Sequence, residues 1–418
     1  MDSLTHPFVL SPTTIRGKYL PFAIITFSVI VDLLNGIVQG LLDLDFSVGV
    51  MYRGLLLLLL LSFSLKKRSF INILFYWIFV LCAWGLLERH FSITHEIINF
   101  SKCIYIYVVL TFFMRYKSCI NSLFLTNCVI GFGLIASTSI IFSYATGIGF
   151  SYADYRFSVK SFFAAGNDIG LALLICLIFS VKHYFEKRTL SSLVIAITIS
   201  LACMLIGSRT GIVGSILIWV VFTVGIFFFK FKALKISILF KLLYLAFIVI
   251  AFFFALQFVI KIITMSDYMR NKFVIEVLIG GEARKSLIEA GNEVITNRRI
   301  VSNLIGQGSF SFKKHVNYEV NGTFADIREV EVDYIDLIGA YGLLGGVFVI
   351  VPLYFFFLAI KNFLKNFTIK DFSNLIAMTV FLGHSFYAGH ALFSPTVSSV
   401  MCVVFYFIVI NRRNKSVI

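Results

Sequence analysis

The chain has 418 residues, of which 59% are hydrophobic, and its mean hydropathy is +0.94. Apolar runs of about 18 residues or more recur along it, which excludes a soluble globular protein. The formal net charge of +15 does not indicate nucleic-acid binding, because the basic residues cluster on alternate connections between the apolar runs.

Taken in chain order, the apolar runs predict an all-α polytopic membrane protein with about twelve transmembrane helices in one integral membrane domain, residues 1–418. The runs lie near residues 20–41, 53–65, 70–87, 97–114, 120–145, 167–182, 189–207, 210–229, 239–264, 334–360, 372–390 and 395–411. The ninth and tenth runs are separated by one long polar loop, residues 266–332. This loop is the longest segment outside the apolar runs that could form a polar site.

The positions of lysine and arginine predict the orientation, because basic residues resist translocation and stay cytoplasmic. Clusters such as Lys66–Arg68, Lys187–Arg188 and Arg412–Arg413 fall on one side if the chain crosses twelve times. We therefore expect both termini in the cytoplasm and the long loop on the outer, periplasmic side.

Polar residues also lie inside the first and eleventh apolar runs. Asp32 and Asn35 share a face of the first run and could line a polar cavity. His384 and His390 lie in the eleventh run and are interpreted as interior hydrogen-bonding groups.

The outer connection from Gly147 to Asp168 contains Arg156 and ends in Asn167-Asp168. Arg156 is a candidate for phosphate binding, with a snorkelling interfacial arginine as the alternative. Asn167 and Asp168 are candidate substrate-cavity residues, although both are also ordinary caps for the helix that begins there.

A very short outer break, Gly207-Ser208-Arg209-Thr210-Gly211, separates the seventh and eighth runs. Arg209 lies at or just inside the outer interface, between glycines that permit close backbone approach. A guanidinium beside free helix-terminal amides can bind phosphate oxygens, and the alternative is a structural ion pair.

Within the long loop, residues 283–303 have helical spacing and predict an amphipathic helix on the membrane surface. Arg298 continues its apolar face, and Arg299 lies on the adjacent stripe. Both are candidates for contact with a lipid headgroup, and a solvated charged pair at the end of the helix is the alternative.

The end of the loop carries the candidate acid and base groups. His315 follows two lysines and could accept a proton, or it is simply an exposed loop histidine. Glu331, Asp333 and Asp336 lead into the tenth run. The helix dipole explains one acidic residue at a helix start, but Asp336 lies about a turn inside, where a carboxylate usually faces a wet cavity.

These features together resemble the O-antigen polymerase and O-antigen ligase superfamily, multi-span enzymes that act on lipid-linked glycans at the outer face of the bacterial inner membrane. The resemblance covers the layout of most of the chain. Its motifs are Gly166-Asn167-Asp168, Gly207-Ser208-Arg209-Thr210-Gly211, and the stretch from Arg298 through Gly306-Gln307-Gly308 and Glu331-Val332-Asp333 to Gly345.

The resemblance implies a metal-independent glycosyltransferase that needs no cofactor and uses an undecaprenyl-pyrophosphate-linked oligosaccharide as donor and acceptor. On this basis Arg209, Arg298, Arg299 and Arg156 would bind pyrophosphate, with Glu331, Asp333 or His315 as the catalytic base and Asp336, Asn167 and Asp168 in the substrate cavity. It further implies contact with membrane lipids and a partner protein that sets chain length.

Ligases of this superfamily carry a histidine where this chain has Glu331 and Asp333. That departure favours a repeat-unit polymerase of the Wzy type, acting in O-antigen or related surface polysaccharide synthesis. The alternatives are an O-antigen ligase that transfers glycan to lipid A core and a flippase or other transporter of the lipid-linked unit. A transporter is disfavoured by the single long loop and by the lack of a visible internal repeat.

Overall fold

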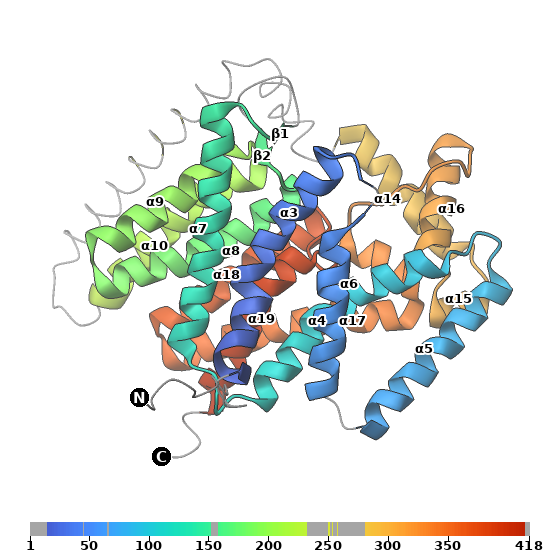
Figure 1. The fold of residues 1–418 in the computed structure, drawn as a ribbon, viewed down its shortest axis with the longest axis horizontal. Helices are drawn as coiled ribbons and strands as arrows, with labels where there is room; N and C mark the ends of the chain where they lie inside the picture. The colour runs from blue at the N-terminus through green and yellow to red at the C-terminus, as the bar shows by residue number, and fades with distance from the viewer. Residues whose placement is uncertain are drawn as a thin grey trace, which may run out of the picture.

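The computed structural model describes residues 15–44, 46–64, 67–151, 158–231 and 281–413, together with the single positions 250, 253 and 257. Over these residues the protein is an assembly of packed helices (Figure 1). Two short strands, β1 (Phe150–Ser151) and β2 (Val159–Ser161), pair antiparallel at one end of it. The predicted all-α class is confirmed.

The first half of the chain forms η1 (Ile15–Tyr19), α2 (Leu20–Phe22), η2 (Ala23–Phe27), α3 (Ser28–Gly40), α4 (Val48–Ser64), α5 (Lys67–Leu87), α6 (Ile93–Arg115), α7 (Ser122–Thr146), α8 (Gly166–Lys187), α9 (Leu190–Leu205) and α10 (Arg209–Phe231). The second half forms α14 (Gly281–Thr296), α15 (Ile300–Ile305), α16 (Ser309–Asn321), α17 (Asp333–Asn366), α18 (Ile369–Tyr387) and α19 (Pro395–Arg413).

Five helical segments among the described residues are long and apolar enough to cross a membrane: Gly17–Gly40, α6, α7, α8 and α17. Five further apolar helices are shorter, at 10–17 residues. A membrane protein is therefore confirmed, and the count of twelve crossings stays a prediction. The ninth expected run, 239–264, lies outside the described residues except at positions 250, 253 and 257.

The connections gather into two groups at opposite ends of the helices. At one end Arg115 Nη1 donates to Ser64 O (2.8 Å), and Asn411 Nδ2 donates to Asp371 Oδ1 (3.0 Å). The described end of α19 lies near this end in Figure 1, whereas β1, β2, α14 and α16 lie away from it. This grouping agrees with the alternation of basic connections in the sequence, and we refer to the end that carries β1, β2 and α16 as the outer end.

α8 lies at the centre of the helical assembly. Of its most apolar stretch, 78% is buried inside the protein, and the helix packs against α7, α9, α10, α18 and α19. Because α8 begins at Gly166, the pair Asn167-Asp168 is held at the middle of the outer end.

The described part of the long loop forms three helices. The prediction of a single helix over 283–303 is wrong at residues 297–299, since α14 ends at Thr296 and a second helix, α15, begins at Ile300. Leu287 and Val294 are buried against Phe312 and Val316 of α16, as the apolar stripe of α14 predicts.

The chain breaks between α14 and α15 because Arg298 turns toward α17. The helix α17 is kinked at Gly342 (φ 58°, ψ −132°), which interrupts its backbone hydrogen bonds. The Ile338 carbonyl accepts a hydrogen bond from Arg298 Nη1 (2.8 Å), and the Ala340 carbonyl accepts one from Gly308 N (2.9 Å). Arg298 and the α15–α16 turn therefore pack against the kink and donate hydrogen bonds to its carbonyl groups.

Glycines make this close contact possible. A Cβ on Gly306 would lie 2.0 Å from the Ala340 oxygen, and one on Gly339 would lie 2.2 Å from the Phe312 ring. Gly346, farther along the same helix, makes no such contact, because a Cβ there would meet no atom within 4 Å among the described residues.

Candidate functional site

Two adjoining cavities open at the outer end of the helices. The larger has a volume of about 390 Å³ and the smaller about 290 Å³. Lys102, Ala165 and Asp168 line both, so the two spaces meet at these residues. We call the larger the apolar compartment and the smaller the polar compartment.

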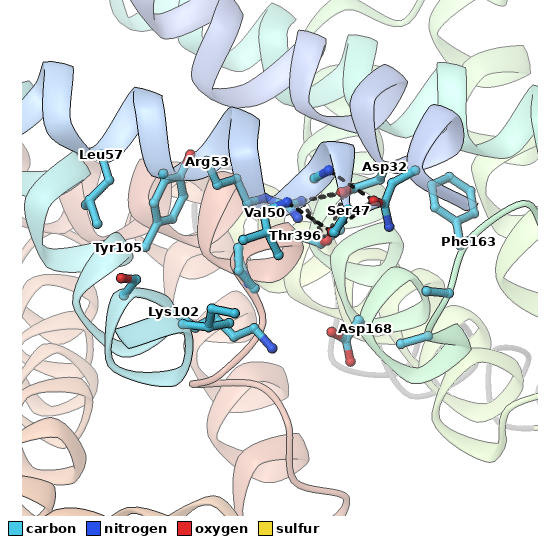
Figure 2. A pocket seen from close by; sticks show the side chains of 18 of the residues that line it. Asp32, Ser47, Val50, Arg53, Leu57, Lys102, Tyr105, Phe163, Asp168 and Thr396 are labelled. Atoms are coloured by element: carbon cyan, nitrogen blue, oxygen red, sulfur yellow. Dashed lines mark hydrogen bonds and ion pairs between the residues drawn. The ribbon is translucent and has the colours of Figure 1, made fainter. Parts of the chain in front are cut away.

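The apolar compartment lies between α3, α4, α6, the start of α8 and the start of α19 (Figure 2). Aliphatic and aromatic side chains form much of its wall, which is lined by Asp32, Asn35, Ser47, Gly49, Val50, Arg53, Gly54, Leu57, Ile97, Ile98, Ser101, Lys102, Tyr105, Phe163, Ala164, Ala165, Asp168, Ile169, Pro395 and Thr396. Asp32 and Asn35 line a cavity, as predicted, but most of its wall is apolar and not polar.

Within this wall, one arginine is already neutralised. Arg53 Nη2 donates to Asp32 Oδ2 at 2.6 Å and to Thr396 Oγ1 at 3.1 Å. The Thr396 hydroxyl in turn lies 2.8 Å from Asp32 Oδ2. A half-buried pair of this kind is favourable only with such added hydrogen bonds, and it ties α3 to α4 and α19.

The polar compartment collects charged and amide side chains from α6, α8, α16, the start of α17 and the α18–α19 connection. Its wall consists of Asn99, Lys102, Ala165, Asn167, Asp168, Ser309, Lys313, Glu329, Asp336, His390 and Phe393. Two lysines, three carboxylic acids and one histidine therefore face a single space.

Lys102 has an unpaired ammonium group. Across the described residues no hydrogen bond or ion pair to it is formed, and the charges that act on it come chiefly from Lys313, Glu329 and Asp168. Figure 2 shows its side chain extending toward Asp168 from the opposite wall. A partly buried ammonium without a partner favours binding of an anion.

Glu329 lies between two basic groups. The Lys313 ammonium forms an ion pair with Glu329 Oε1, and His390 Nδ1 lies 3.1 Å from Oε2. Burial by itself would raise the pKa of the Glu329 carboxyl, but Lys313 and His390 outweigh it and hold that pKa below its ordinary value. The carboxylate is therefore ionised at neutral pH, and it orients both neighbours.

The two lysines are brought together by helices far apart in the sequence. Asn99 Nδ2 donates to Ser309 Oγ (3.0 Å) across a separation of 210 positions, which fixes α6 against α16. Lys102 lies three residues beyond Asn99 on α6, and Lys313 lies four residues beyond Ser309 on α16. Each lysine is therefore on the face of its helix that makes this contact.

The structure places three of the predicted residues together. Asn167, Asp168 and Asp336, expected in the substrate cavity, all line the polar compartment. Asp336 Oδ1 accepts a hydrogen bond from Val330 N (3.1 Å), which orients the carboxyl from the first turn of α17.

The predicted acidic bases Glu331 and Asp333 line neither compartment. The Glu331 side chain is 53% exposed and lies 3.8 Å from Arg284. Its backbone has a positive φ of 62°, which turns the side chain away from the helix start. Asp333 is fully buried, and its Oδ2 accepts a hydrogen bond from Leu392 N (3.0 Å), so it anchors the α18–α19 connection.

His315, the third predicted base, lies on another face of α16. Its Nδ1 is 2.8 Å from Ser311 O, and its ring packs edge-on against Phe324 with centroids 5.5 Å apart. Because His315 follows Lys313 by two residues, a helix places the two side chains on different faces. His315 therefore belongs to an aromatic cluster and not to the compartments.

Of the predicted arginines, the two whose side chains the structure describes, Arg298 and Arg299, line neither compartment. Arg298 caps the interrupted carbonyls of α17 and donates Nε to Asn303 Oδ1 (2.7 Å). Arg299 is exposed and precedes α15. The backbone of Arg209 begins α10, but its side chain lies outside the described part of the structure, as does the whole of Arg156.

Sequence reasoning missed Lys102, Lys313, Glu329 and the position of His390. The histidine is not inside a helix, because α18 ends at Tyr387 and His390 follows in a turn with φ 63°. Lys102 carried a usable signal, since a lysine within an apolar run is costly and usually functional. Glu329 and Lys313 carried none, because the loop is rich in charge throughout.

Comparison with protein-family models found no matching model, and comparison with curated proteins found no matching sequence. The chemistry of the compartments is therefore argued from their geometry.

Proposed function

We propose that this chain transfers glycan from a polyprenyl-diphosphate carrier at the outer face of the membrane and thereby polymerises lipid-linked repeat units. The observation that carries the proposal is the junction of an apolar compartment with a lysine-bearing polar compartment at Lys102 and Asp168. The proposed substrate has an isoprenoid chain, then a diphosphate, then a sugar. The isoprenoid chain needs an apolar space, and the diphosphate and sugar need a charged, polar space beside it.

The apolar compartment suits the first isoprene units of such a carrier. Leu57, Ile97 and Phe163 supply hydrocarbon and aromatic contacts in its wall. Gly54 leaves space, since a Cβ at this position would meet no atom within 4 Å among the described residues. A chain of methyl-branched units could thus enter from the membrane beside α4.

The lysine pair suits the diphosphate. Departure of a lipid diphosphate builds negative charge on phosphate oxygens, and ammonium groups fixed beside it stabilise that charge. Lys102 is unpaired in the described structure, and Lys313, which lines the same compartment, is held by its ion pair with Glu329. Of the arginines that the sequence suggested, Arg298 donates to a backbone carbonyl of α17 and Arg299 is exposed.

His390 is the residue best placed to accept the proton of the attacking sugar hydroxyl. If Nδ1–H donates to Glu329 Oε2, the neutral ring presents Nε2 as an acceptor, and the carboxylate stabilises the imidazolium that forms. The hydroxyl oxygen then bonds to the anomeric carbon as the bond from that carbon to the diphosphate oxygen breaks. The proton stays on His390, and the electron pair leaves with the diphosphate.

The test is deletion of the gene followed by electrophoresis of surface polysaccharide. Loss of a polymerase leaves lipid A core carrying a single repeat unit, loss of a ligase leaves no attached glycan, and loss of a flippase strands units inside the cell. A single-unit product supports the proposal, and a normal ladder from the deletion strain would refute it.

Complementation by cavity-filling variants makes this test specific to the site. Gly54→Leu adds a side chain at the wall of the apolar compartment, where its Cβ would meet open space, so it should obstruct the compartment and fail to restore the ladder. The matched control is Gly383→Leu on α18, where a Cβ also meets no atom within 4 Å among the described residues and which lines neither compartment. Equal ladders from the two variants would separate the activity from this cavity.

A further inference from the structure

A carboxylate of α6 holds the first turn of α16. Glu96 is fully buried, and its two oxygens accept different backbone amides: Oε2 from Ser309 N (2.8 Å) and Oε1 from Phe310 N (2.7 Å). No ion pair to Glu96 is formed within the described part of the chain. A buried carboxylate is costly unless it is fully satisfied, and the amides of a helix N-terminus satisfy it.

The chain around this contact is shaped to permit it. Gly308 precedes α16 with φ 81° and ψ 150°, a region that only glycine adopts readily. A Cβ on Gly308 would lie 3.0 Å from Glu96 Oε1. The turn before α16 is also fixed by Trp84, whose Nε1 donates to Ile305 O (3.2 Å).

Glu96 shares a face of α6 with residues of the polar compartment. Asn99 and Lys102 follow it at intervals of three, which places the three side chains along one stripe. Glu96 and Asn99 both bind Ser309, at its backbone and at its hydroxyl, and Lys102 continues the stripe into the compartment. One turn beyond Ser309, α16 supplies Lys313.

We propose that Glu96 is a positioning residue that sets the distance between the Lys102 and Lys313 ammonium groups by clamping α16 onto α6. The consequence for diphosphate binding rests on the function proposed above, whereas the effect on the position of Lys313 does not. In this view the carboxylate acts only through α16 and does not touch substrate.

Glu96→Gln is the informative variant, because it keeps the shape of the side chain and replaces one acceptor oxygen with an amide group that faces a backbone N–H. The buried N–H then loses its partner. Glu88→Gln is the matched control, since among the described residues the one hydrogen bond between Glu88 and α16 is that donated by the Ser311 hydroxyl (3.1 Å).

The position of α16 is measured on the purified full-length protein in two ways. Hydrogen exchange followed by mass spectrometry reports on the amides of residues 309–313, and brief labelling with acetic anhydride reports on Lys313, whose side chain is only 10% exposed. Both rates should rise in Glu96→Gln and stay near wild type in Glu88→Gln, with exchange in α19 unchanged. Unchanged rates at α16 would overturn the proposal.

The functional consequence is measured as the affinity for farnesyl diphosphate. Loss of the clamp should weaken it by about tenfold in Glu96→Gln, the equivalent of one buried hydrogen bond, and leave it unchanged in Glu88→Gln. Faster exchange with unchanged affinity would also overturn the proposal. If wild type does not bind the probe, the proposed function fails, and the exchange and labelling rates alone decide the role of Glu96.

A second variant guards against a failure to fold. Glu96→Asp keeps the charge but shortens the side chain by one methylene group, so it should reach only one of the two amides. It is expected to change the exchange and labelling rates in the same direction by a smaller amount, and wild-type rates in this variant would contradict the clamp.

Discussion

Lys102 carries the clearest chemical signal in the molecule, a cation in the wall between two compartments with no partner among the described residues. Substituting Lys102→Met keeps the length of the side chain and removes its charge. We expect binding of farnesyl diphosphate to weaken by about tenfold to a hundredfold, because a hydrogen bond to a charged group contributes about 1.5–3 kcal/mol.

Thermal stability should not fall in Lys102→Met, since no ion pair of the described residues is lost. Lys285→Met is the control, because Lys285 is 78% exposed on α14 and lines neither compartment. Equal affinity in the two variants would remove Lys102 from the binding site.

Glu329 predicts a defined dependence of stability on pH. Its pKa is lowered in the folded protein from an ordinary 4.5, so its ion pair with Lys313 is complete above that value and disappears as the pH falls through the lower folded pKa. The difference in melting temperature between wild type and Glu329→Gln in detergent should persist from about pH 8 to pH 5 and shrink only in stronger acid.

Early loss of this difference would contradict this account of Glu329. A stability difference that vanishes already near neutrality would mean that the carboxyl is not held ionised by Lys313 and His390.

Residue identities in the sequence predicted part of this site. Asp336, Asn167 and Asp168 line the polar compartment because each stands at the start of a helix that enters the membrane, a position readable from hydropathy. The lysine pair depends on a contact between Asn99 and Ser309, and the orientation of His390 depends on a positive φ. Neither the contact nor the backbone angle can be recognised from a local pattern in a single sequence.

At the scale of the element, the kink in α17 organises the outer loop. Gly306 (φ 79°, ψ −170°) packs against the backbone of α17 at this kink. Gly306→Ala should destabilise the protein by about 1–3 kcal/mol from backbone strain alone, because this conformation is essentially restricted to glycine. The melting temperature should fall, and exchange in α15 and α16 should rise first.

Gly346→Ala is the control for this prediction, since Gly346 lies on the same helix with open space around its Cα. If the two variants melt at the same temperature, the α15–α16 turn is not held by the kink.

Arg298 is expected to act on stability and not on diphosphate binding. Arg298→Met removes the hydrogen bonds to Ile338 O and Asn303, with a cost of about 1.5–3 kcal/mol for donors on a charged group. The measurement is the melting temperature together with the affinity for farnesyl diphosphate per folded molecule. A loss of affinity at unchanged melting temperature would instead support the pyrophosphate role that the sequence suggested.

Helix positions were largely predictable, and the form of the loop was not. Long apolar runs specify where helices lie, so most expected runs coincide with observed helices. The helical spacing of 283–303 continued past the real end of α14 because Arg298 gains more from capping α17 than from extending its own helix.

At the scale of the whole molecule, the outer ends of α3, α4, α6, α8, α17 and α19 meet around the two compartments. At the opposite end, Arg115 donates a hydrogen bond to the last residue of α4. If the basic connections are cytoplasmic, as the sequence predicts, the two compartments face the other side of the membrane.

The most direct test of the central claim is chain elongation by the purified protein in lipid vesicles supplied with a polyprenyl-diphosphate-linked repeat unit. Wild type and Gly383→Leu should form products longer than one unit, while Gly54→Leu and Lys102→Met should leave the single unit unchanged. Elongation by Gly54→Leu at the wild-type rate, or a lack of elongation by wild type, would contradict the assignment of this cavity to a lipid-linked glycan.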